Sequence, residues 1–265
     1  MTGLPVLRSG LLSGAAGTVH GFTSRVPGLG TADGNVGYSP PRDQQDAWRN
    51  RQAWSDFIGV DPERLVTPGQ VHGNVVLEAR ARDAGIGARP GSGKLGLGDA
   101  MMTGESGPVL FSLHADCLPL LLVDPGRNAA RAVAAVHAGW RGTVADVAGA
   151  AVRAMGEAYG TRPESLLAYI GPAIGPCCYE VGEEVIAAWR ETAGADASAA
   201  IAAGTARDHL DLQAANTLLL RRAGLREEHI DLAGICTRCE AGRWFTHRGQ
   251  GATTGRFAAV IAISG

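Results

Sequence analysis

The stretch Phe111-Ser-Leu-His-Ala-Asp-Cys-Leu-Pro-Leu-Leu-Leu-Val123 is an apolar run with a polar centre formed by His114, Asp116 and Cys117. Burying a carboxylate, an imidazole and a thiol among leucines costs free energy unless each of these groups finds a partner. We therefore expect the polar centre to have partners elsewhere in the chain.

The apolar pieces on either side of this centre predict two core strands. Runs of four to eight apolar residues between turn signals are typical of buried strands, which here cover residues 108–113 and 118–123. A second stretch of the same kind, Ala132-Val-Ala-Ala-Val-His-Ala-Gly-Trp-Arg-Gly142, is an apolar strand that ends on His137. We expect Cys117 and His137 to meet where these strands end.

The composition predicts a globular protein. The chain has 265 residues, of which 45% are apolar and 19% charged, so a sizeable core can form. Its 24 basic and 26 acidic residues give a net charge of -2. This balance favours neither a nucleic acid nor a membrane surface as partner, and the oligomeric state stays open.

Cysteine usage and the termini bear on the compartment. The first residues have no basic segment followed by a long apolar core, and no stretch is apolar enough to span a membrane. Five cysteines, two of them adjacent, make a disulfide scaffold improbable in a chain of this size. We expect a cytoplasmic protein.

The remaining patterns predict an alternation of helices and strands in a single α/β or α+β domain that covers residues 1–265. Residues 81–98, rich in glycine, and 193–205, rich in alanine and glycine, are expected to be flexible loops. We expect helices at residues 43–58, 142–159, 181–189 and 211–223, and further strands at residues 18–24, 74–78, 165–170, 229–235 and 256–263.

Three residues at the edges of apolar strands form a candidate zinc site: His72, Cys117 and His137. Imidazole nitrogen and thiolate sulfur are preferred zinc ligands, and three protein ligands leave a fourth position open, as in catalytic sites. The three residues form no compact motif. In the alternative interpretation the histidines are hydrogen-bonded loop residues and Cys117 is a small buried apolar side chain.

The other four cysteines give a weaker signal. Cys236 and Cys239 form a CxxC pair without two further ligands at similar spacing, so we expect a structural or incidental role. Cys177 and Cys178 are adjacent, which disfavours both as ligands of one metal. A reactive thiol is possible at such a turn, but burial is the expected role.

Two arginines are candidates for binding an anion. Arg141 follows His137 at the predicted start of a helix, and Arg248 lies in a glycine-rich turn before the last strand. Arginine near helix-start amides suits phosphate, although a single arginine is more often a solvated surface residue. The glycines at 249, 251 and 255 match no nucleotide-binding fingerprint.

The longer motifs resemble one known family. From about residue 19 to the C-terminus the chain is similar to the proteins long named multicopper polyphenol oxidases or laccase-domain proteins and now described as purine nucleoside phosphorylases. The motifs that carry the resemblance occur in this order: Pro68-Gly-Gln-Val-His-Gly73, Ala115-Asp-Cys-Leu-Pro119, His137-Ala-Gly-Trp-Arg-Gly142, Ile170-Gly-Pro-Ala-Ile-Gly-Pro-Cys-Cys-Tyr-Glu-Val-Gly182 and Thr254-Gly-Arg-Phe-Ala258.

The resemblance implies a four-layer α-β-β-α sandwich with mixed sheets, similar to the fold of certain cysteine hydrolases. It implies a zinc site on His72, Cys117 and His137, in which copper could replace zinc. It also implies phosphorolysis of adenosine, inosine, guanosine and methylthioadenosine, with deamination of adenosine in the same site. The chain does not look like a true laccase, because a multicopper cluster needs many histidines and this chain has only 7, widely scattered.

The resemblance also suggests roles for individual residues. Asn35 and Asp116 are expected to contact the substrate, and Arg141 or Arg248 to hold the phosphate that attacks the ribose. The general acid stays open between Asp116 and Glu180.

The chain departs from the family pattern at three places. His114 stands where the family often has threonine, so it is either a polar group near the metal or points to the opposite face. The usual Asn-Leu-Gly is Asn35-Val-Gly37, and the usual Ser-Tyr-Arg-Arg is Thr246-His-Arg-Gly249, so that only Arg248 carries over.

Other functions remain open at this point. A metal-independent cysteine hydrolase would use Cys117 as nucleophile and His137 as its base. A polyphenol oxidase with copper and a non-catalytic metal-binding module are the further alternatives.

Overall fold

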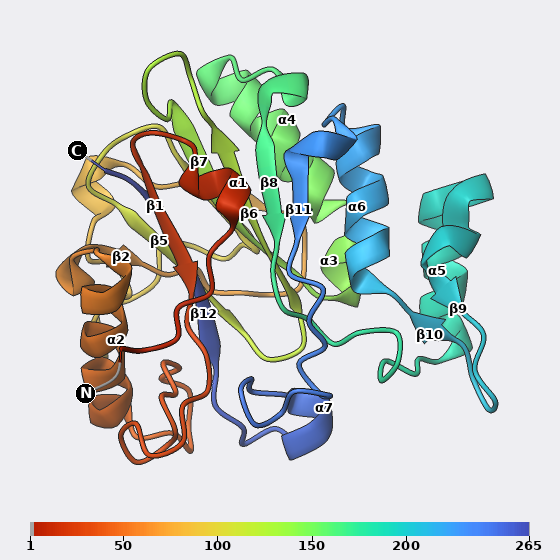
Figure 1. Ribbon diagram of the computed structural model, residues 1–265, viewed down its shortest axis with the longest axis horizontal. Helices are drawn as coiled ribbons and strands as arrows, with labels where there is room; N and C mark the ends of the chain where they lie inside the picture. The colour runs from red at the N-terminus through yellow and green to blue at the C-terminus, as the bar shows by residue number, and fades with distance from the viewer. Residues whose placement is uncertain (1–2, 265) are drawn as a thin grey trace.

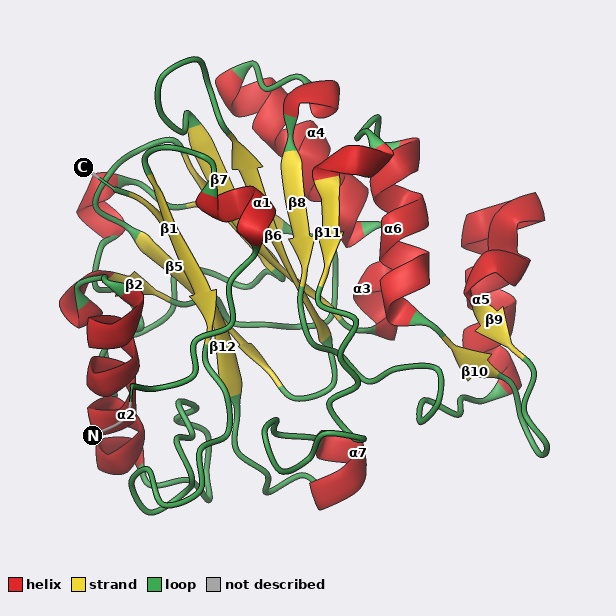
Figure 2. Cartoon of the chain, viewed as in Figure 1, coloured by secondary structure: helices red, strands yellow, loops and turns green. Residues whose placement is uncertain are grey.

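The computed structural model describes residues 3–264, whose strands form two main sheets (Figures 1 and 2). The four-stranded sheet has the order β1 (Thr18–Phe22), β12 (Phe257–Ile263), β5 (Val109–His114) and β2 (Leu65–Val66). The six-stranded sheet has the order β11 (Ile230–Leu232), β8 (Leu167–Ile170), β6 (Leu118–Asp124), β7 (Ala132–Ala138), β4 (Ala100–Thr103) and β3 (Val76–Glu78). Both sheets mix parallel and antiparallel pairs.

Helices cover the outer face of each sheet. The helices are α1 (Gly10–Ser13), α2 (Gln44–Ile58), α3 (Trp140–Val144), α4 (Val147–Tyr159), α5 (Glu183–Ala193), α6 (Leu212–Arg222) and α7 (His247–Gln250). Helix α2 lies against the four-stranded sheet, whereas α3, α4 and α6 lie on the far side of the six-stranded sheet (Figure 1).

Alternation along the strands explains why the apolar runs are continuous. In β12, Phe257 and Ile261 pack between the two sheets, and Val260 packs toward α2. In β6, Leu121 packs between the sheets and Leu120 packs toward the helices. Each of these strands is thus buried on both faces, as its composition predicts.

The two strands predicted around the polar centre are present, but they belong to different sheets. β5 lies in the four-stranded sheet and β6 in the six-stranded sheet, so residues 115–117 carry the chain from one sheet to the other. Asp116 has a φ of 82°, a left-handed conformation that permits this sharp crossing. The polar centre therefore lies between the end of β5 and the start of β6, where the chain crosses from one sheet to the other.

Most predicted helices begin and end where their capping residues indicate. The Asp43 side chain accepts hydrogen bonds at the start of α2, and Gly59 ends the helix with a φ of 92°. The single helix predicted at residues 142–159 is wrong in one respect, because it is two helices. Asp146, with a φ of 57°, ends the first and caps α4 through its side chain.

The two segments expected to be flexible loops differ in structure. Residues 81–98 contain one short 3-10 turn and are otherwise irregular, but the buried Arg51 donates hydrogen bonds to the carbonyls of Gly87 and Ala88. Residues 194–200 form a 3-10 helix that leads into β9 (Ile201–Ala202), which pairs with β10 (His209–Leu210). Ala197 and Ala200 of this segment are buried in the core. The alanine- and glycine-rich sequence predicted only a flexible loop here and gave no sign of this packing.

Among residues 3–264 we find no helix with the length and hydrophobicity that a membrane crossing requires.

Candidate functional site

The candidate site lies at the ends of the central strands β6 and β7 of the six-stranded sheet. Cys117 directly precedes β6, and His137 is near the end of β7. The antiparallel register pairs Leu118 with Ala138, which brings these two residues to the same edge. Asp99 directly precedes β4, the other neighbour of β7, and its carbonyl accepts a hydrogen bond from the His137 amide at 2.7 Å.

The structure brings together the three residues that we predicted as zinc ligands. One ligand atom from each of His72, Cys117 and His137 lies within 4.8 Å of the others. The Cys117 Sγ is 3.9 Å from His72 Nε2, and the two imidazole rings are 5.0 Å apart between centroids. His137 is buried and His72 is exposed, so the group opens to solvent on one side.

Gly139 allows this close approach. A Cβ placed at Gly139 would lie 2.9 Å from Cys117 Sγ and 3.1 Å from His72 Cδ2. Both distances are shorter than ordinary van der Waals contact, so any side chain here would push two of the three candidate ligands apart.

We expect the Gly139→Ala variant to fold but to lose about 10²-fold in catalytic rate, because a displacement near 1 Å at reacting groups costs about that much. Turnover and bound metal are measured on the same sample. Gly242→Ala is the matched control, since a Cβ there meets nothing within 4 Å. Equal activity of the two variants would contradict the assignment of this site.

Asp99 holds two of the three candidate ligands in place. Its carboxylate accepts hydrogen bonds from the amides of His72 at 2.9 Å and Gly73 at 2.7 Å, and from His137 Nδ1 at 2.9 Å. These bonds fix His72 in a left-handed conformation with a φ of 63° and leave His137 Nε2 free to face Cys117. Carboxylates that orient metal-binding histidines in this way are common around metal sites.

Sequence reasoning missed Asp99, because it precedes a short strand within a glycine-rich segment and its partner follows 38 residues later. Only the register of β4 against β7 brings the two side chains together.

We expect Asp99→Asn to weaken metal binding at this site by about 10- to 100-fold, since the neutral amide no longer supports His137 as the carboxylate does. Competition with a chromogenic chelator measures the affinity. Asp124→Asn is the control, because Asp124 is also buried and hydrogen-bonded but lies at the opposite end of β6. An unchanged affinity in Asp99→Asn would contradict the orienting role.

Cys117 and His137 form a charged pair. Burial disfavours the thiolate, but the charge of His137 and hydrogen bonds from both histidines lower the pKa of Cys117 to about 6. Burial likewise disfavours the imidazolium, but the Cys117 thiolate and the hydrogen bond to Asp99 raise the pKa of His137 to about 9. A cation that binds here therefore meets a thiolate and releases the proton of His137.

The donor set fits zinc. One thiolate and two imidazoles are typical zinc ligands, and a set of three leaves a position for water or substrate. Within the described part of the chain, His72 and His137 are the only histidines that gather with other metal-binding side chains. A cluster of several copper ions with many histidine ligands does not fit this arrangement.

His114 does not join this group as a ligand. It is buried on the face of β5 that points between the sheets, where Ser112 Oγ lies 2.8 Å from its Nε2 and the Cys117 carbonyl lies 3.2 Å from its Nδ1. Burial keeps the pKa of His114 well below its usual value, so the ring is neutral. A neutral ring that donates from Nδ1 to the carbonyl and accepts from the serine hydroxyl satisfies both contacts. His114 thus holds the backbone of Cys117.

Asp116 holds the loop that carries Arg248. One carboxylate oxygen accepts a hydrogen bond from Thr237 Oγ1 at 2.6 Å, and the other accepts one from the Arg248 amide at 2.6 Å. The Arg248 side chain donates to the carbonyl of Glu180 at 2.8 Å and lies over the ring of Tyr179. The protein itself therefore occupies both oxygens of Asp116.

A cavity of about 630 Å³ opens beside the three candidate ligands. That volume is typical of small-molecule sites. Among the residues that line it in the described chain, Asp116 is the only acidic one. The basic lining residues are Arg42, His72, Lys94, His137, His247, Arg248 and Arg256, and the apolar wall is formed by Pro68, Leu113, Ile174, Tyr179 and Leu212. The charge of this lining favours an anion, although the whole chain is slightly acidic.

The predicted site residues outside the three candidate ligands lie in different places. Arg248 and Asp116 line the cavity, but Arg141 is not among the lining residues and its guanidinium lies 4.3 Å from the ring centroid of Trp140. Asn35 is buried, and its side chain bonds both backbone groups of Gly37 and the amide of Arg256. Asn35 thus positions Gly37 and Arg256, both of which line the cavity.

Sequence reasoning missed four basic residues of the cavity: Arg42, Lys94, His247 and Arg256. Arg256 belongs to the Thr254-Gly-Arg-Phe-Ala258 motif that carried the family resemblance, so a signal was present. Arg42 and Lys94 lie in glycine- or proline-rich segments that read only as surface loops.

Comparisons with known proteins identify the family of the chain. A family model described as "Multi-copper polyphenol oxidoreductase laccase" matches residues 19–264. The protein named "Purine nucleoside phosphorylase YlmD" from Geobacillus stearothermophilus is 34% identical over 261 residues, which cover 93% of this chain and 90% of the relative. A crystal structure of YlmD from that organism has a TM-score of 0.90 at 33% identity and covers 98% of this chain and 96% of its own.

A further relative carries a different name. The protein named "Adenosine deaminase RL5", from an unknown prokaryotic organism, is 36% identical over 202 residues, which cover 75% of each chain. The match of the family model over nearly the whole chain and the agreement with YlmD together decide the family. The chain belongs to the multi-copper polyphenol oxidoreductase laccase family, in which its relatives are named purine nucleoside phosphorylases and, in one case, adenosine deaminase.

Proposed function

We propose that this protein is a zinc-dependent purine nucleoside phosphorylase that also deaminates adenosine. The observation that carries the proposal is the junction of two features: a cavity with a cationic lining and, at its wall, the group His72, Cys117 and His137. The names of the relatives support the same reaction. The proposed nucleosides are adenosine, inosine, guanosine and methylthioadenosine.

Arginines of the cavity bind the phosphate in this proposal. Phosphorolysis needs inorganic phosphate close to C1′ of the ribose, and guanidinium groups match the oxygens of phosphate in two-point hydrogen bonds. Arg248 reaches the cavity from α7, and Arg256 reaches it from the start of β12. Burial lowers the pKa of Arg256 to about 10, so its guanidinium remains charged at neutral pH. Arg141, at the start of α3, does not line the cavity, so we expect it to contribute less to phosphate binding than Arg248.

The apolar wall of the cavity binds the purine. Leu113, Ile174 and Tyr179 offer apolar and aromatic surface against which a purine ring can pack. Tyr179 also lies under the guanidinium of Arg248 at 5.1 Å, so the base and the phosphate would bind side by side.

The three candidate ligands act through zinc in this proposal. When bound there, zinc supplies Lewis acidity, which suits hydrolytic loss of an amino group. Asp99 keeps His72 and His137 aimed at one point, and Cys117 contributes a thiolate that is already ionised near neutral pH.

Neither Asp116 nor Glu180, the two candidates for a general acid, is available for that role. Both oxygens of Asp116 accept hydrogen bonds from the protein, and Glu180 is not among the residues that line the cavity. Asp116 acts in this proposal by positioning Arg248 for phosphate.

We also propose the remaining family features for this chain. The order of helix α2, four-stranded sheet, six-stranded sheet and helices α3, α4 and α6 suits a four-layer α-β-β-α sandwich of the cysteine-hydrolase-like kind. Residues 1–265 would form one catalytic domain, which acts in the cytoplasm.

Product analysis with each nucleoside tests the proposal. The metal-loaded protein is incubated with the four nucleosides in phosphate buffer and in phosphate-free buffer. We expect free purine only with phosphate, together with ribose 1-phosphate or, from methylthioadenosine, 5-methylthioribose 1-phosphate. We expect inosine from adenosine in both buffers. Purine release at the same rate without phosphate would indicate hydrolysis instead, and no turnover of any nucleoside would contradict the proposal.

A further inference from the structure

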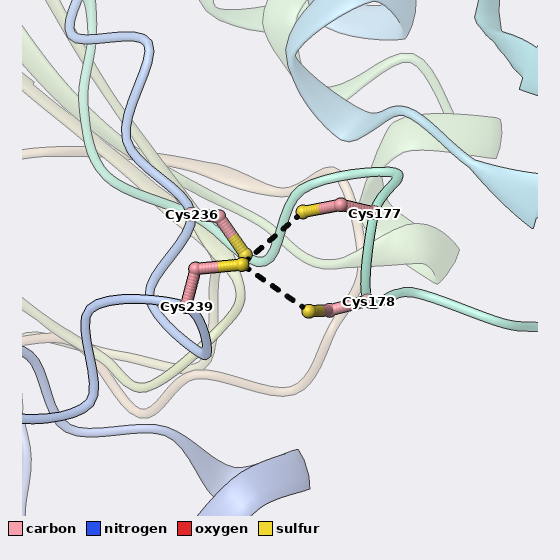
Figure 3. A group of neighbouring side chains, drawn as sticks. All are labelled: Cys177, Cys178, Cys236 and Cys239. Atoms are coloured by element: carbon pink, nitrogen blue, oxygen red, sulfur yellow. Dashed lines mark hydrogen bonds between the residues drawn. The ribbon is translucent and has the colours of Figure 1, made fainter.

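The four cysteines outside the proposed zinc site gather into a second cluster, the four-cysteine cluster: Cys177, Cys178, Cys236 and Cys239 (Figure 3). All four sulfur atoms lie within 4.8 Å of one another. The Sγ of Cys239 is 3.5 Å from that of Cys177 and 3.5 Å from that of Cys178. None of the four residues is among those that line the cavity, so this cluster is separate from the candidate active site.

Two neighbouring parallel strands bring the cysteine pairs together. β8 and β11 run parallel, so the loops that follow them leave the sheet at the same edge. Two backbone hydrogen bonds also join the loops that follow β8 and β11. The Thr237 amide donates to the Ala173 carbonyl at 3.0 Å, and the Ala173 amide donates to the Ile235 carbonyl at 3.3 Å. Spacing along the sequence could not reveal this cluster, because 57 residues separate the two pairs.

Backbone amides point at one of the sulfur atoms. The Gly175 amide donates a hydrogen bond to Cys236 Sγ at 3.2 Å, and the nearby amides of Cys239 and Arg238 help to lower the pKa of this thiol against the effect of burial. Such N–H donors stabilise a thiolate and are typical of sulfur ligands held in metal sites. Glycine at position 175 favours the close approach, because a Cβ there would lie 3.2 Å from the Cys236 Cβ, a tight contact.

The spacing of the sulfur atoms matches a tetrahedral site. Four sulfurs at the usual zinc–sulfur distance of about 2.3 Å stand about 3.8 Å apart along each tetrahedral edge. The observed separations of 3.5 Å, with every other pair within 4.8 Å, need only small side-chain adjustments to reach that geometry. Cys177 and Cys239 are exposed, so an ion can reach the cluster from solvent.

We propose that Cys177, Cys178, Cys236 and Cys239 bind one zinc ion as a structural site that fastens the β8 loop to the β11 loop. Zinc is the expected ion because four thiolates in tetrahedral array are its common structural ligand set, and a closed set of four leaves no position for substrate. The prediction that adjacent Cys177 and Cys178 are disfavoured as ligands of one metal is not supported by this geometry, since the tight turn at Gly175–Tyr179 brings both sulfurs to Cys239.

The location of the cluster gives the ion a role in building the cavity. The β8 loop carries Tyr179, and the β11 loop leads through Thr237 to Arg248. Thr237 directly follows Cys236 and donates to Asp116, the neighbour of Cys117. The ion therefore fastens the wall that presents Tyr179 and Arg248 without touching substrate.

Metal analysis of the purified full-length protein tests the proposal. We expect two zinc ions per chain in the wild type, one in Cys117→Ala and one in the double variant Cys236→Ser with Cys239→Ser. X-ray absorption at the zinc edge of Cys117→Ala should show four sulfur neighbours at about 2.3 Å. The double variant should retain turnover but bind phosphate more weakly, because Arg248 is less well held.

Outcomes of this test separate the two zinc sites. If the proposed function is wrong about zinc at His72, Cys117 and His137, the wild type and Cys117→Ala both hold one ion with sulfur neighbours only. The structural site is overturned if zinc bound to Cys117→Ala shows nitrogen or oxygen neighbours, or if that variant binds no zinc. It is also overturned if mass spectrometry finds the wild type lighter by two hydrogens per disulfide. The absorption and mass measurements on proteins with all four cysteines decide the matter even if the double variant does not fold.

Discussion

Cys117→Ala is expected to lose at least about 10³-fold in phosphate-dependent nucleoside cleavage and in adenosine deamination. The thiolate is the one anionic ligand among the three, and its loss would remove the proposed zinc ion, whose Lewis acidity would lower the barrier by several kcal/mol. The methyl group of alanine fills most of the space of Cys117, which is half-buried, so the fold should persist. Initial rates with inosine and with adenosine, together with zinc content, measure the effect.

Two controls make the Cys117 result decisive. Circular dichroism and thermal unfolding establish whether the variant is folded, and zinc retained at the proposed four-cysteine site would establish that metal loading was intact. Unchanged activity would remove Cys117 from the mechanism. Full activity in a metal-free wild type whose Cys117 reacts with an alkylating reagent would instead favour the cysteine hydrolase, in which His137 acts as the base.

Arg248→Ala is expected to lower phosphorolysis by about 10²-fold at limiting phosphate, since it removes a charged hydrogen-bond donor from the phosphate site. Deamination of adenosine consumes water rather than phosphate, so its rate should change little. The ratio of the two rates on the same sample therefore measures the phosphate contribution of Arg248 separately from any damage to the metal site.

Arg141→Ala is the matched control for Arg248. Both arginines lie close to aromatic rings, but only Arg248 lines the cavity. We expect a clearly smaller rise in the KM for phosphate in Arg141→Ala than in Arg248→Ala. The reverse order would assign phosphate to the start of α3 and leave Arg248 as a structural residue.

Local signals in the sequence predicted most of the strands, the longer capped helices and the candidate zinc ligands, but they missed β2, β4, β9 and β10. β5 and β6 follow from their apolar runs, and α2 follows from its capping residues Asp43 and Gly59. His72, Cys117 and His137 could be singled out because each is a metal-binding residue type at the edge of an apolar strand. The family motifs around these residues support the same selection, whereas their spacing along the sequence forms no compact metal-binding motif.

What the sequence could not predict depends on contacts between distant segments. Asp99 reaches His137 only through the register of two strands, and the four-cysteine cluster forms only because β8 and β11 are parallel neighbours. The role of His114 depends on which face of β5 points between the sheets. These features need the strand order of both sheets, which no local pattern in the chain specifies.

The zinc dependence of phosphorolysis is tested most directly by measuring cleavage of inosine while zinc is removed and then added back. The wild type is stripped by a chelator, zinc is added back in steps, and the release of hypoxanthine is measured at each level with and without phosphate. We predict that phosphate-dependent release of hypoxanthine disappears when zinc is stripped. It should return as zinc refills the proposed site at His72, Cys117 and His137, which the Cys117→Ala variant lacks. Phosphate-dependent release that persists in fully stripped protein would contradict a role of zinc in phosphorolysis.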